Sequence, residues 1–166
     1  MRERLATDLR AILTAAGTTA MLVTHDQEEA FAVADRIAVM RAGRIVQQGP
    51  VAEVWAAPAD PETALFLGYA RVVQGAAAAL LVPGAGTVAL RRSALTVSDT
   101  GILSGRVVSA RATPEQVRLV VEVQGIGEVD AVTSLDGHPA VGSDVRLAVD
   151  HTRLAAIPGD VRPASP

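Results

Sequence analysis

The chain of 166 residues contains no lysine and no cysteine, and all fifteen of its basic residues are arginines. A phosphate-binding loop of the G-x-x-x-x-G-K-[ST] type needs a lysine to reach the β- and γ-phosphates of a nucleotide. This chain therefore cannot contain such a loop. The absence of cysteine excludes a disulfide scaffold and fits a reducing compartment.

Aromatic residues make up only 2% of the chain, while 49% of its residues are apolar. Its core must be built from alanine, valine, leucine and isoleucine, which bury less area per residue than aromatic side chains, so marginal stability or oligomerisation is expected. The net charge of −3 argues against a nucleic-acid partner, because nucleic acid attracts basic faces. No run reaches the ~18 apolar residues of a membrane span.

The most informative stretch runs from Met21 to Ala30, MLVTHDQEEA. The apolar run Ala20 to Val23 predicts a strand buried on both faces of a parallel sheet. His25 follows it directly, and Asp26 can cap a helix while Glu29 reaches back as in a capping box. The pattern predicts a histidine at the C-terminal tip of a strand, beside a helix N-terminus that favours an anion.

The elements around this stretch alternate. The sequence predicts a helix that stops at Gly17, a hairpin of Arg36 to Met40 with Ile45 to Gln48, and short helices over Val51 to Ala56 and Pro61 to Leu67. Asp60 is expected to cap the last of these helices, and Trp55, the only tryptophan, to anchor the helix that contains it.

After about residue 74 the pattern changes to period-2 runs without a convincing helix. Short strands separated by glycine pairs predict a small barrel or sandwich. The strands are expected at Ala78 to Val82, Thr87 to Leu90, Arg106 to Ser109, Val117 to Val123, Val129 to Thr133 and Val145 to Val149.

The stretch around His25 is followed by Ala34-Asp35-Arg36-Ile37-Ala38-Val39-Met40 and by Arg41-Ala42-Gly43-Arg44-Ile45-Val46-Gln47-Gln48-Gly49. In order and spacing these segments resemble the switch-histidine region of ABC transporter ATPases, most closely the importer subunits for ferric iron, polyamines, sulfate and maltose. The resemblance covers residues 2 to 70. It implies an α+β chain with two domains, residues 1–70 being the C-terminal part of an α/β ABC ATPase domain. Residues 71–166 would then form an all-β regulatory and dimerisation domain of oligonucleotide/oligosaccharide-barrel type.

The resemblance also implies the roles of three residues. His25 would contact the terminal phosphate of ATP as a catalytic residue, and Thr24 and Asp26 would support the nucleotide site. ATP and Mg would be the cofactors of the intact subunit. An imidazole placed there can donate to a phosphate oxygen and orient the attacking water.

Several motifs of that family are missing from the chain. There is no apolar run ending in Asp-Glu, and Leu103-Ser104-Gly105 starts like the LSGGQ motif but continues as a strand. We therefore expect this chain alone to be inactive and to bind no cofactor. In the intact subunit the resemblance implies a homodimer and transmembrane permease partners. It also implies a cytoplasmic location on the inner face of the membrane, and import of ferric iron or another small solute.

Two weaker patterns have simpler explanations. Gly84-Ala85-Gly86-Thr87-Val88-Ala89 fits a dinucleotide fingerprint, but a strand and not a helix is expected after it, so a glycine turn between strands is favoured. His138 and His151 match no zinc spacing and are expected to be solvated.

The alternative for the whole chain is a standalone β-domain that binds a small oxyanion and carries a vestigial helical arm.

Overall fold

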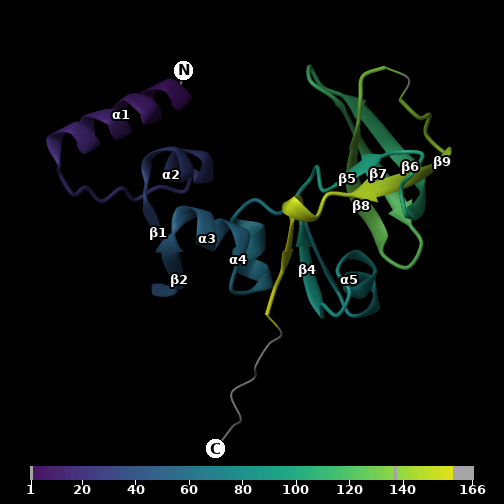
Figure 1. Ribbon diagram of the computed structural model, residues 1–166, viewed down its shortest axis with the longest axis horizontal. Helices are drawn as coiled ribbons and strands as arrows, with labels where there is room; N and C mark the ends of the chain where they lie inside the picture. Colours follow the sequence, from purple (N-terminus) through teal and green to yellow (C-terminus); the bar gives the residue numbers. More distant parts are fainter. Residues whose placement is uncertain (1, 137, 159–166) are drawn as a thin grey trace, which may run out of the picture. The chain divides into compact units, whose positions relative to one another are not determined.

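The computed structural model describes residues 2–136 and 138–158, and it is a mixed α/β structure. The chain divides into two compact units, Met1–Ala59 and Asp60–Pro166. Each unit is described by itself below, and Figure 1 labels the elements of both.

The first unit consists of three helices and a hairpin. The helices are α1 (Arg2–Ala16), α2 (Gln27–Val33) and α3 (Val51–Ala56), and the hairpin pairs β1 (Arg36–Arg41) with β2 (Arg44–Pro50). Both hairpin strands and the helix that stops at Gly17 confirm the prediction. Among the side chains that the structure describes in this unit, the buried hydrophobic residues are Val39 from the hairpin and Val51 and Val54 from α3.

The prediction of a strand over Ala20 to Val23 is wrong. These residues belong to no helix or sheet, and Met21 and Val23 are 85% and 91% exposed. A fully apolar strand is stable only when neighbouring strands take its backbone hydrogen bonds and other layers cover its faces. The described residues of the first unit supply neither.

The described part of the second unit contains a short helix, a three-stranded sheet and a barrel, and the last strand of the sheet follows the barrel strands in the chain. Helix α4 (Pro61–Phe66) begins at Asp60, whose carboxylate accepts the Thr63 N–H at 2.7 Å, as predicted. The sheet has the order β10-β4-β3, formed by β10 (Leu154–Ala156), β4 (Thr87–Leu90) and β3 (Arg71–Gln74).

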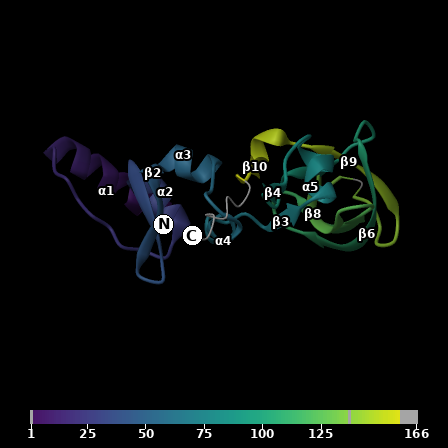
Figure 2. The same ribbon diagram turned by 90° about the horizontal axis from the view of Figure 1, so that it is seen from below.

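The expectation that no helix follows residue 74 is also wrong. Helix α5 (Ala76–Leu81) occupies most of the segment predicted as a strand at Ala78 to Val82, and it lies beside β3 and β4 (Figures 1 and 2). A short apolar run does not distinguish a strand from a buried helix by its pattern. Alanine is the best helix former, and Ala78 and Leu81 are buried on one side of α5.

The barrel is closed by five strands in the order β5-β8-β7-β6-β9. Alternate residues of β7 are buried, as the period-2 pattern predicted, and the main core of the unit is made of valine and leucine side chains. Neighbours are antiparallel except β5 and β8. The strands are β5 (Leu95–Val97), β6 (Leu103–Ala112), β7 (Val117–Val123), β8 (Gly127–Thr133) and β9 (Asp144–Val149).

Candidate functional site

Helix α2 has a tightly built N-terminus. The Asp26 carboxylate accepts the N–H groups of Glu28 and Glu29 at 3.0 and 3.1 Å, which confirms the predicted cap. The Thr24 hydroxyl accepts the Asp26 N–H at 3.0 Å and donates to the Glu29 carboxylate at 2.7 Å. Glu29 thus reaches back across the turn to the Thr24 hydroxyl, and Thr24 and Asp26 are both held in place.

His25 lies between these two anchored residues and is exposed. Within the described part of the chain its imidazole has no hydrogen-bond or ion-pair partner. The backbone on both sides of His25 is therefore held by hydrogen bonds, while both ring nitrogens remain available to a ligand. An imidazole presented in this way can donate to an oxyanion or accept from a water molecule.

Contacts within the first unit hold α2 in position. The Arg10 guanidinium of α1 donates to the Val33 carbonyl at 3.0 Å and pairs with the Asp35 carboxylate. On α2, the Phe31 ring meets the Trp55 ring of α3 with the centroids 4.6 Å apart, which confirms the expected anchoring role of Trp55. The His25 turn is thereby connected to both other helices of the unit.

The residues around His25 do not fit a complete ATP and magnesium site. Only one imidazole is free, because the Asp26 carboxylate caps the helix and the Glu29 carboxylate is bonded to Thr24. The chain contains no lysine, which a phosphate-binding loop of the G-x-x-x-x-G-K-[ST] type requires. Among the described residues there is also no group of three or more His, Cys, Asp or Glu side chains that could hold a metal ion.

The glycine motifs have structural roles. A β-carbon on Gly105 would lie 2.6 Å from Val121 Cγ1 and 2.7 Å from the Glu122 carbonyl oxygen, so β6 needs a glycine there for packing against β7. This confirms that Leu103-Ser104-Gly105 is part of a strand. Gly84 has a φ of +82° in the turn before β4, which confirms the glycine turn, but the element before this turn is helix α5 and not the expected strand. His138 and His151 are both exposed.

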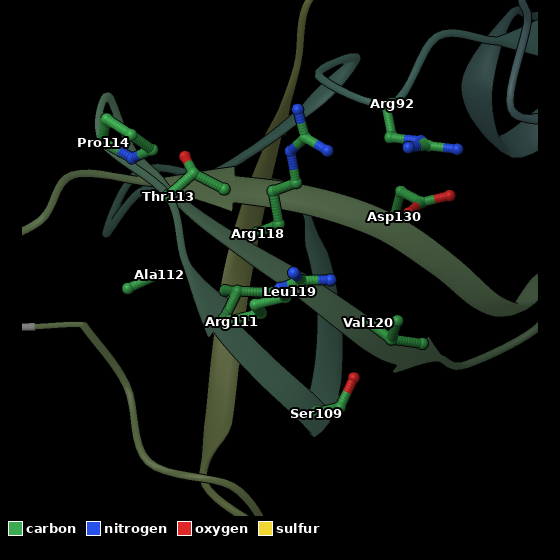
Figure 3. Close-up of a pocket in the computed structure, with 10 residues that line it drawn as sticks. All are labelled: Arg92, Ser109, Arg111, Ala112, Thr113, Pro114, Arg118, Leu119, Val120 and Asp130. Carbon is green, nitrogen blue, oxygen red and sulfur yellow. The ribbon is translucent and has the colours of Figure 1, made fainter.

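A second concave site lies on the barrel and was not predicted from the sequence. Figure 3 shows Arg111 and Arg118 on adjacent strands, with Arg92 and Asp130 to one side of them. The available sequence signal was the pair of arginines on either side of the Thr113-Pro114-Glu115-Gln116 turn. Without the strand register, nothing showed that the two side chains share a face.

Comparisons with known proteins identify the class. No family model matches the chain. The Fe(3+) ions import ATP-binding protein of Streptomyces avermitilis is 37% identical over 176 residues, covering 96% of this chain and 51% of that protein. The Fe(3+) ions import ATP-binding protein of Streptomyces coelicolor is 36% identical, and it covers 96% of this chain. A spermidine/putrescine import ATP-binding protein of Methylococcus capsulatus is 38% identical, covering 96% of this chain and 45% of that protein.

Over most of its length the chain is therefore homologous to ATP-binding subunits of ABC importers, as its motifs predicted. More particularly, it corresponds to the C-terminal part of such a subunit. It spans about half the length of the curated relatives that it matches. No helix among the described residues is long and apolar enough to cross a membrane.

Proposed function

We propose that this chain acts as the C-terminal part of the ATP-hydrolysing subunit of a bacterial ABC importer, with His25 in contact with the terminal phosphate of ATP. The observation that carries the proposal is the presentation of His25. Its imidazole is exposed and without a partner in the described chain, and it lies between Thr24 and Asp26, which are both hydrogen-bonded. A positioned donor of this kind stabilises the charge that develops during phosphoryl transfer.

Thr24 and Asp26 support the site by positioning His25. Removing the Asp26 carboxylate would free the first N–H groups of α2, and removing the Thr24 hydroxyl would release both the Asp26 N–H and the Glu29 carboxylate. Neither residue needs to touch the nucleotide to influence where the imidazole lies. ATP and Mg would be held chiefly by parts of the intact subunit other than this chain.

Exposed apolar residues in the first unit support its membership of a larger ATPase domain. Leu9 and Ile12 on α1 are 40% and 64% exposed, and the segment Met21 to Val23 is exposed as well. Exposed apolar surface of this kind marks a contact with other protein. In the intact subunit, the remainder of the ATPase domain would cover it and pair with the backbone of Ala20 to Val23.

The barrel unit would serve as the regulatory and dimerisation domain, of oligonucleotide/oligosaccharide-barrel type. Its closed five-stranded barrel and its place after the ATPase segment support this role. The intact subunit would be a homodimer, bound to transmembrane permease subunits on the cytoplasmic face of the membrane. Ferric iron or another small solute would be imported, since the first relatives named above import Fe(3+).

A fusion protein tests the proposal. The part of the Streptomyces avermitilis subunit that this chain does not cover would be joined to this chain, and the ATP turnover of the fusion would be measured. We expect His25→Ala to lower turnover by about 10²–10³-fold while ATP binding stays close to that of the parent, because the lost donor acts mainly in the transition state.

His151→Ala is the matched control, since His151 is also an exposed histidine but lies in the barrel unit. It should leave turnover unchanged. A His25→Ala fusion that hydrolyses ATP within about twofold of the parent would contradict the catalytic role.

A further inference from the structure

A pocket with a volume of about 440 Å³ lies open on the outer face of the barrel (Figure 3). Its walls come from β6, β7 and β8 and from the turn after β4. Three arginines line it, Arg92, Arg111 and Arg118, and the only carboxylate among its lining residues is that of Asp130. With three positive charges against one negative, the pocket carries a formal charge of +2.

A bulge in β6 puts Arg111 into this pocket. The pairing of β6 with β7 shifts register between Val107 and Ser109, so one extra residue is accommodated there. Because side chains alternate along a strand, an extra residue moves everything after it to the opposite face. Val107 is buried, whereas Arg111 is exposed and lies directly opposite Arg118 on β7.

Two arginines directly opposite each other on neighbouring strands repel, which destabilises the pair. In the described part of the chain, neither they nor Arg92 nor Asp130 has an ion-pair or hydrogen-bond partner. Glu115, the carboxylate in the turn between β6 and β7, is not among the residues that line the pocket and does not offset the charge of its arginines.

The other end of the same face is arranged differently. Arg106 of β6 lies between Asp144 of β9 and Glu122 of β7 in the ladder, and its Nε is 3.1 Å from the Asp144 carboxylate. Next to Arg92 in sequence, Arg91 lies over the Tyr69 ring, 4.2 Å from its centroid. Those two arginines have partners within the protein, whereas the three pocket arginines have none among the residues that the structure describes.

We propose that this pocket binds a small polyvalent anion that carries phosphoryl groups. Guanidinium groups present planar pairs of N–H donors that match phosphate oxygens, and three of them line this pocket with Asp130 as the only carboxylate among its lining residues. The pocket volume lies in the range of small-molecule sites and leaves room for more than one phosphoryl group. The exposed Ser109 hydroxyl adds a neutral donor at the edge.

The anion could be a free inorganic phosphate compound or the phosphate chain of a nucleotide, which present the same oxygens to the arginines. Binding would neutralise the repulsion between Arg111 and Arg118, so the ligand should also stabilise the fold. The proposal concerns the barrel unit only and holds whether or not His25 acts on ATP.

The test uses the full chain and inorganic pyrophosphate in a buffer of low ionic strength, with sodium chloride at matched ionic strength as the reference. Calorimetry and thermal unfolding would be measured in parallel. We expect binding, together with a rise in the unfolding temperature that chloride does not produce. Arg111→Gln and Arg118→Gln should each weaken binding by about tenfold or more, because each removes a charge-assisted hydrogen bond.

Without ligand, both variants should unfold at a higher temperature than the parent chain, because the like-charge pair is gone. Arg106→Gln is the matched control, an arginine on the same face outside the pocket, and it should bind pyrophosphate within about twofold of the parent. Arg92→Gln is a third, independent variant, which tests the pocket even if a strand substitution fails to fold.

The proposal is overturned if the parent chain does not bind pyrophosphate, or if Arg106→Gln weakens binding as much as Arg118→Gln. A parallel titration with adenosine diphosphate distinguishes a free inorganic phosphate compound from a nucleotide as the ligand. Affinity equal to that of pyrophosphate shows that only the phosphates are bound, and higher affinity shows that the nucleoside is bound too. In either case Arg118→Gln must weaken binding by about tenfold or more, and nucleotide binding that this substitution leaves unchanged overturns the proposal. His25→Ala should leave pyrophosphate binding unchanged, so a failure here is distinct from a failure of the importer function.

Discussion

A β-carbon added to Gly101 would lie 2.3 Å from the carbonyl carbon of Leu147, in the middle of β9. Leu147 is fully buried in the barrel core, and the Gly101 carbonyl accepts a hydrogen bond from Arg146 Nε at 2.8 Å. Backbone therefore contacts backbone at this point, and neither segment can move without disturbing the barrel.

We expect Gly101→Ala to lower the free energy of unfolding by about 3 kcal/mol, because overpacking against a buried strand forces a backbone shift. Urea unfolding followed by circular dichroism measures it. Gly86→Ala is the matched control, since a β-carbon there meets no atom within 4 Å. Equal effects of the two substitutions would contradict this account of the barrel.

Thr63 on α4 is 1% exposed, and its hydroxyl oxygen is buried without a hydrogen-bond partner in the described chain. Thr63→Val keeps the shape and removes the buried polar group, so the free energy of unfolding should rise by about 1 kcal/mol. Thr63→Ser keeps the hydroxyl and loses a methyl group, and it should destabilise instead. A destabilised valine variant in thermal unfolding would show that the hydroxyl has a partner.

Asp150 gives the barrel unit a pH-dependent contact. Hydrogen bonds from the Thr152 side chain and backbone, at 2.6 and 3.0 Å, lower the pKa of Asp150 below the ordinary value of an aspartate. A lowered folded-state pKa contributes stability above the unfolded value, and this contribution is lost as the pH falls through the folded value.

The parent chain should therefore lose more stability than Asp150→Asn when the pH is lowered from about 5 to about 2. Asparagine can still cap the turn but carries no charge. The difference should persist in high salt, because the largest cause is hydrogen bonding from Thr152 and not the nearby Arg153 charge. If the parent chain and Asp150→Asn lose the same stability as the pH falls, the pH dependence does not come from Asp150.

Nucleotide binding by this chain alone should be weak. A single imidazole, without a lysine-bearing loop or a metal-binding carboxylate beside it, cannot hold a triphosphate. Calorimetric titration with Mg-ATP at physiological salt should show no micromolar affinity and no hydrolysis. Any weak association at low salt should disappear with Arg118→Gln and survive His25→Ala, which would assign it to the arginine pocket.

We also expect the chain to self-associate through its second unit. The strands β3 and β10 form the two edges of a three-stranded sheet, and unpaired edges are ready to pair with another chain. A symmetric contact is the common solution for a homodimer. Sedimentation equilibrium at micromolar concentration should show species heavier than the 17.1 kDa protomer, and a single mass of 17.1 kDa would reject the prediction.

Local signals in the sequence were sufficient for much of the fold. The caps at Asp26 and Asp60, the hairpin around Gly43 and the alternation over Val117 to Val123 each depend on neighbouring residues, and the structure confirms them. The motif order around His25 was also sufficient to place the chain among ABC importer ATP-binding subunits. These features are readable because a cap, a turn or a period-2 face is specified within a few residues.

Long-range contacts decided the rest. The Ala20 to Val23 segment has strand composition but no sheet to join, whereas Ala76–Leu81 resembles a strand and becomes a helix against β3 and β4. The arginine pocket depends on a bulge at Val108, which changes the face that Arg111 occupies. Sequence determined the local propensity of each segment, but register and burial are set by partners distant in the chain, and only the tertiary structure supplies them.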